Sequence, residues 1–160
     1  MPSLLRLVLT GFGVVALQWF LLSRLPIYGV TPDAVLLFVT VVALRYGRVQ
    51  GALAGFGFGL LADLLVNPSL LGLQAFAKTL MGFVVGQFRT EENELLRASP
   101  AQTALSALTV ALVHNVIVIF VLALTQETRT LFLVTGLWLG SALYTAGIAL
   151  VGAFLSRQSS

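Results

Sequence analysis

Apolar residues are gathered in six runs along the chain, separated by short polar or proline-containing turns. The runs cover residues 4–23, 32–44, 49–66, 71–88, 101–124 and 131–155. A transmembrane helix needs about 20 mainly apolar residues to cross a hydrocarbon core of about 30 Å, and the first run has this length. The second run is short, so we expect a partial or tilted span. The pattern predicts an all-α, polytopic membrane protein: a six-transmembrane-helix bundle forming a single integral membrane domain over residues 1–160.

The third run contains a glycine repeat, called here the glycine ridge: Gly47, Gly51, Gly55 and Gly59, followed at the same spacing by Asp63. Residues four apart lie on one side of a helix, so the ridge is a strip without side chains. In water each interior glycine would weaken the helix by about 1 kcal/mol relative to alanine. In lipid, small residues let a neighbouring helix approach closely. The ridge therefore predicts a surface for helix packing or for a partner.

A second strip of small residues lies in the fourth run. Its members, separated by four, three and four positions, are Ala75, Thr79, Gly82 and Gly86. This spacing places them on one face of a helix, where they are able to face the glycine ridge. Such spacing indicates contact between helices and does not by itself indicate a function.

Composition supports the membrane prediction and excludes other classes. Hydrophobic residues make up 58% of the chain, charged residues 9%, and the mean hydropathy is +1.00. A soluble domain of 160 residues has too little interior to bury so many apolar side chains. The net charge of +3 builds no basic stripe, so we expect no nucleic-acid partner. With no cysteine, one histidine and no nucleophile or phosphate-binding motif, we expect no metal site, no cofactor and no enzymatic activity.

Two ionisable residues, Asp63 and Lys78, lie inside apolar runs, where a charge is costly unless it is paired or hydrated. A short turn joins the two runs, so a contact between Lys78 and Asp63 is geometrically possible. One interpretation is structural: the pair joins two helices, or Lys78 extends to the interface and Asp63 binds water. The other is functional: the charges form a site for a coupling ion or an anionic ligand. The sequence leaves both open.

His114 and Asn115 lie near the middle of the fifth run. A proton relay through His114 needs a chain of partners, and no other carboxylate lies at a comparable depth. We therefore expect a neutral His114 that is hydrogen-bonded across helices.

The basic residues indicate an orientation. If both termini lie on one side of the membrane, that side holds six of the nine basic residues: Arg6, Arg45, Arg48, Arg89, Arg97 and Arg157. The opposite side holds Arg24 and Arg129. Because short cytoplasmic loops are enriched in lysine and arginine, we expect both termini to be cytoplasmic.

The block from Pro32 to Arg89 also carries a family resemblance. Its segments PDAVLLF, ALRYGRVQGALAGFGFGL and LADLLVNPSLLGLQAFAKTLMGFVVGQFR resemble the bacterial rod shape-determining protein MreD family. The resemblance implies a non-enzymatic subunit of the bacterial inner membrane that supports lateral peptidoglycan synthesis and cell-shape control. It implies MreC as a partner, with MreB, RodA and penicillin-binding protein 2 in a larger assembly. It also implies a fold similar to the substrate-binding subunits of energy-coupling-factor vitamin transporters.

Three functions follow from these expectations. The first is a scaffold in the lipid bilayer whose grooves receive the single membrane helix of MreC, with the 89–100 loop adding cytoplasmic contacts. The second is a small-molecule, vitamin-like carrier subunit, which needs a polar pocket and a lid. The outer connections 24–31, 67–70 and 126–130 are too short for a lid, which favours the scaffold. A channel is least favoured, because six helices of this size fill their own centre and supply no ring of like charges.

Overall fold

The computed structural model describes residues 4–26, 30–66, 71–89, 91, 98–125 and 138–158. All the long elements within these ranges are helices, which confirms the all-α prediction for this part of the chain. The elements are α1 Leu4–Phe20, η1 Leu22–Arg24, α2 Ala34–Tyr46, α3 Arg48–Val66, α4 Leu73–Val85, η3 Gly86–Phe88, α6 Pro100–Thr125 and α7 Ser141–Gln158.

Most helix ends lie close to the predicted ones. α2 has 13 residues, as short as its apolar run indicated, and α6 begins and ends one residue outside its run. The fourth run divides into α4 and the single 3-10 turn η3. The last run differs most: α7 begins at Ser141 after a π-helical segment at 138–140, and residues 131–137 lie outside the described residues.

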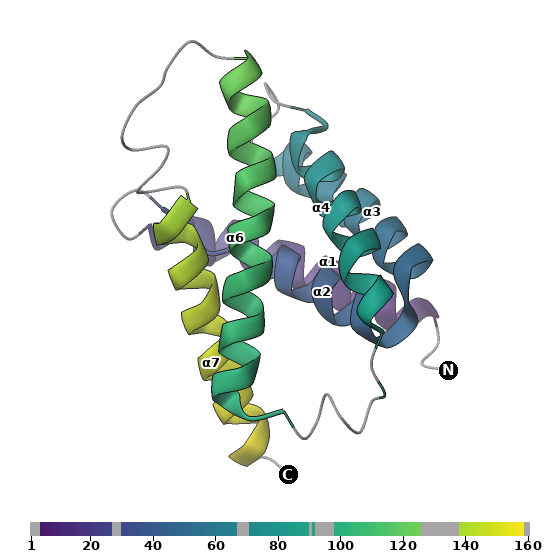
Figure 1. The fold of residues 1–160 in the computed structure, drawn as a ribbon, viewed down its shortest axis with the longest axis vertical. Coiled ribbons are helices and arrows are strands. Elements are labelled where there is room, and N and C mark those ends of the chain that lie inside the picture. Colours follow the sequence, from purple (N-terminus) through teal and green to yellow (C-terminus); the bar gives the residue numbers. More distant parts are fainter. Residues whose placement is uncertain are drawn as a thin grey trace.

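α2 lies at the centre of the arrangement. It contacts α1, α3 and α4 and also reaches α6 and α7. α3 and α4 lie against each other as one pair, and α6 and α7 run side by side as another (Figure 1). Elements from both ends of the chain therefore meet around one short helix.

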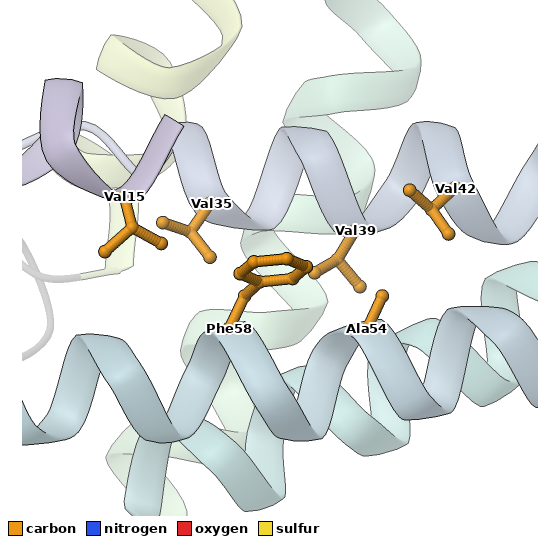
Figure 2. Close-up of a cluster of buried hydrophobic side chains, with 6 residues drawn as sticks. All are labelled: Val15, Val35, Val39, Val42, Ala54 and Phe58. Atoms are coloured by element: carbon orange, nitrogen blue, oxygen red, sulfur yellow. The ribbon is translucent and has the colours of Figure 1, made fainter. Parts of the chain in front are cut away.

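A hydrophobic cluster joins α1, α2 and α3. Its buried members are Val15, Val35, Val39, Val42, Ala54 and Phe58 (Figure 2). The ring of Phe58 points from α3 towards α2, with its centroid 5.2 Å from that of Phe38. The same ring occupies the space where a Cβ of Gly11 would lie. Gly11 of α1 is therefore a contact residue that the sequence analysis did not identify.

A second cluster joins α2 and α4 to the α6–α7 pair. Its buried members are Leu36, Ala43, Met81, Val85, Ala111 and Ala142. The members from α6 and α7 are both alanines, so these two helices approach α2 through short side chains. The two clusters lie on different sides of α2 and together contain the five buried residues among its 13.

Many large apolar side chains are exposed, and a few polar side chains are buried beside the apolar clusters. Large apolar side chains are more than half exposed on α1, α3, α6 and α7, for example Leu9, Leu53, Phe120 and Val151. Among the described residues, the polar or charged side chains buried inside are Asp63, Lys78, His114, Asn115 and Thr145. Exposed apolar surface and buried polar groups are the two informative departures from a soluble protein's surface.

Within the described residues, three helices are long and apolar enough to cross a membrane: Leu5–Arg24, Pro100–Leu124 and Trp138–Ser156. α2 is apolar but shorter. α4 also has 13 residues, which at 1.5 Å per residue is less than the hydrocarbon thickness of about 30 Å.

Candidate functional site

The glycine ridge lies directly against α4. A Cβ built at Gly55 would come closer than 3.0 Å to the backbone of Lys78, and one at Gly59 closer than 3.0 Å to the backbone of Ala75. Gly51 and Gly82 face each other, so that a Cβ on either would collide with the other's carbonyl group. The two helix backbones are therefore in contact along the pair, which a side chain at any of these glycines would prevent.

The two end positions of the glycine set have different roles. Gly86 meets the backbone of Arg48 and so extends the contact to the start of α3. The backbone of Gly47 also lies against Gly86, but its own Cβ position is open: Gly47 ends α2 with φ +91°, and the nearest atom to that position is Arg89 Cδ at 3.7 Å. Because L-residues rarely adopt this φ, Gly47 allows the chain to reverse between α2 and α3.

Asp63 caps the start of α4. Its two carboxylate oxygens accept hydrogen bonds from the backbone N–H groups of Gly72, Gln74 and Ala75, each at 3.0 Å. The residue at the N-cap position, Gly72, has no side chain to do this. The unpaired N–H groups and positive dipole at a helix start favour a carboxylate there. Asp63 therefore closes the α3–α4 hairpin from the opposite helix.

Lys78 is paired with Asp33. Its Nζ lies 2.6 Å from Asp33 Oδ2 and also donates to Gln74 Oε1, one turn earlier on α4. Only 2% of Lys78 is exposed, so it does not extend to a polar surface. The possible contact with Asp63 is not the one formed, because the α4 backbone occupies the oxygens of Asp63. The ion pair joins α4 to the start of α2.

Asp33 is the centre of a hydrogen-bond network. Its Oδ1 accepts from Leu36 N–H at 2.8 Å, which caps α2, and its own N–H donates to Thr145 Oγ1 of α7 at 3.0 Å. Gln18 of α1 bonds the adjoining backbone on both sides, donating to Pro32 O at 2.7 Å and accepting from Ala34 N–H at 2.8 Å. Polar contacts around Asp33 therefore join α1, α2, α4 and α7.

The hydrogen bond predicted from His114 to another helix is made by its neighbour Asn115, which reaches the segment after α6. His114 Nδ1 lies 3.3 Å from Asn115 Oδ1 on the same helix, and Asn115 Nδ2 makes the cross-segment bond, to Trp138 O at 3.1 Å. The expected bond from His114 to another helix is absent among the described residues, because Asn115 reaches Trp138 instead. His114 Nε2 is buried and has no hydrogen-bond partner within the described part of the chain.

These residues surround a cavity of about 240 Å³, called here the polar cavity. Its wall includes the polar side chains of Gln18, Asp33, Asp63, Gln74, Lys78, His114, Asn115 and Ser141. They come from the last turns of α1 and α3, the first turns of α2, α4 and α7, and the middle of α6. The cavity therefore lies near the adjoining ends of α1 and α2 and of α3 and α4, beside the middle of α6.

The sequence analysis missed Asp33 and Gln74 as parts of this site. Asp33 follows Pro32 and precedes an apolar run, which is the signature of a helix start and gives no sign of a second role. Gln74 lies four residues before Lys78, so their shared helix face was readable from spacing. The contact between α2 and α4 was not readable, because it depends on how the helices assemble.

The described residues contain no group of three or more side chains that could hold a metal ion. Comparison of the chain with protein-family models, curated proteins and solved structures finds no match.

Proposed function

We propose that this chain is an integral protein of the bacterial inner membrane with six membrane helices and both termini in the cytoplasm. The fold we propose is similar to that of the substrate-binding subunits of energy-coupling-factor transporters. The exposed apolar side chains, the buried Lys78 in its pair with Asp33, and the three helices of spanning length among the described residues support a membrane location. The short α2 and α4 would then cross with the help of the turns that continue them.

The proposed role is a non-enzymatic scaffold of the cell-elongation complex, in the manner of MreD. The observation that supports it best is the joint occurrence of two features in residues 32–89. This block carries the resemblance to the MreD family, and it folds into the backbone-contacting unit of α2, α3 and α4. A unit held by backbone contacts is rigid, and its outer faces present large apolar side chains such as Leu53 and Phe76. A rigid apolar body suits the binding of a partner's membrane helix.

The proposed partner is MreC, bound through its membrane helix, with RodA, penicillin-binding protein 2 and MreB in a larger assembly. The test is recovery of the tagged chain from its own membranes in mild detergent, with mass spectrometry of what remains bound. We expect MreC in a fixed ratio to the chain. The matched control is an MreC whose membrane helix is replaced by an unrelated apolar helix, which should not be recovered. A folded chain that recovers both forms of MreC equally, or neither, contradicts the proposal.

A second candidate function is that of a vitamin-like small-molecule carrier subunit, and the polar cavity favours it. A carrier has to release its cargo, so exchange is the decisive property. Uptake of a small molecule that depends on this chain, in cells where MreC is not recovered with it, would favour the carrier over the scaffold.

A further inference from the structure

We propose that the polar cavity is a binding site for a small, uncharged, planar molecule that carries an amide or a similar donor–acceptor pair. The inference goes beyond the scaffold role, which needs no ligand. It rests on three observations: the size of the cavity, the state of its charged groups, and the buried nitrogen of His114.

The cavity is large enough for one ring with a polar substituent. Its volume is about 240 Å³. An apolar cavity of about 150 Å³ in another protein holds benzene, so this one has room for a few more non-hydrogen atoms. The apolar cavity stays dry, whereas this one is lined by many polar side chains. Its occupant therefore has to form hydrogen bonds.

The charged groups in the wall already have partners. Asp33 accepts from Lys78 and from Leu36 N–H, and Asp63 accepts three backbone N–H groups at the start of α4. A charged ligand would have to displace one of these contacts or lose its hydration without a full counter-charge, and both oppose its binding. The wall favours an uncharged molecule.

The groups that remain for a ligand are polar and uncommitted. His114 is 2% exposed, lines the cavity and leaves Nε2 without a partner among the described residues. Lys78 Nζ carries three donors, and the described residues supply two acceptors, on Asp33 and Gln74. An amide offers a carbonyl oxygen to Lys78 and an N–H group or lone pair to His114, whichever tautomer is present. Buried polar atoms normally have a hydrogen-bond partner, so we take the unpartnered Nε2 of His114 as a contact point for a bound molecule.

The experiment compares isosteric probes on the detergent-solubilised full chain. Benzamide, benzamidine and benzoate share one ring and the same number of non-hydrogen atoms, and differ in charge as neutral, cation and anion at pH 7. Isopropylbenzene has the same size without polar groups. Binding is measured by isothermal titration calorimetry, with the same detergent lacking protein as a blank. We expect benzamide to bind with a dissociation constant of about 1 mM or below, and the other three at least about ten-fold more weakly.

A pair of α6 variants locates the binding. Val118 lines the cavity and is buried, whereas Val116 is half-exposed and does not line it. Val118→Phe should abolish benzamide binding, and Val116→Phe should leave it unchanged. If Val118→Phe does not fold, His114→Leu takes its place, and the comparison of the four probes on the unaltered chain needs no variant.

Several results would overturn the inference: no binding of benzamide, tighter binding of either charged probe, equal binding of isopropylbenzene, or loss of binding in Val116→Phe alone. Recovery of MreC is measured on separate material, so the ligand site and the scaffold role can each fail without the other.

Discussion

The glycines at the α3–α4 contact and the glycines of α7 have opposite surroundings. In α3 and α4, Gly51, Gly55 and Gly82 point inwards and bring two backbones into contact. In α7, Gly147 and Gly152 have no described atom within 4 Å of their Cβ positions, and the α6–α7 pair contributes alanines such as Ala111 and Ala142 to the interior. A small residue in an apolar helix can thus lie at a contact or on an open face. Which of the two it is depends on whether another helix packs against that face.

The sharpest test of this comparison is Gly55→Leu. Overpacking typically costs about 1–3 kcal/mol, and the cost is higher here because the new side chain would have to displace the backbone of Lys78. We expect little folded protein by size-exclusion chromatography in detergent. Gly57→Leu is the control, because Gly57 lies on the same helix and has nothing within 4 Å of its Cβ position. Equal loss of folded protein in both variants would show that the close contact at Gly55 is not the cause of the loss.

The next largest effect concerns the ion pair that joins the α3–α4 pair to α2. Lys78→Met leaves the partly buried Asp33 without its partner; loss of a fully buried partner costs about 3–5 kcal/mol, and the 20% exposure of the Asp33 side chain places the expected cost at the low end of that range. The double variant Lys78→Met with Asp33→Asn should recover most of that stability, as measured by thermal unfolding in detergent. No recovery would mean that Lys78 acts through contacts other than the pair.

Asp63→Ala should weaken the α3–α4 pair by a smaller amount. It leaves three N–H groups at the start of α4 without their acceptor, at an expected cost of about 1–3 kcal/mol. Hydrogen exchange of the first turn of α4 should rise, while exchange in α6 should not change. The exposed Glu91→Ala serves as control and should leave exchange in α4 as it is. Uniformly faster exchange in both helices would contradict a local capping role.

The smallest effect, and of opposite sign, is expected for Gly147→Ala in α7. Nothing near Gly147 would resist a methyl group, and alanine favours a helix over glycine by about 1 kcal/mol. The unfolding midpoint should rise slightly or stay constant. A clear fall would reveal that a neighbour covers this face of α7, and the contrast between the two helix pairs would no longer hold.

Sequence pattern predicted the helices and the glycine contact better than it predicted the polar site. The length of an apolar run and the polar residues that end it depend only on neighbouring residues in the chain. The observed bounds of α2 and α6 therefore lie within two residues of the predicted ones. Gly55 and Gly82 were predictable as contacts because their strips lie on helices joined by a short turn. Gly11 was not, because its partner Phe58 lies on a helix more distant in the chain.

The partner of Lys78 could not be predicted for a related reason. Asp63 and Asp33 are both carboxylates at helix ends, and the sequence offers no measure of which one an assembled bundle brings to Lys78. The backbone N–H groups of α4 occupy Asp63, and this leaves Asp33. Likewise Asn115, and not His114, reaches Trp138, a choice that depends on the rotation of α6. Interactions between distant segments thus decided the chemistry of the site.

The bond from Asp33 N–H to Thr145 joins residues 112 positions apart. On a ribosome, Asp33 and Lys78 emerge long before α7, so the ion pair can form while the chain is still being made. Thr145 is made later with α7, so the hydrogen bond from Asp33 N–H forms only once α7 has packed against the start of α2. The attachment of α7 to the start of α2 is therefore a late step of assembly, added to an ion pair that the earlier helices can form without it.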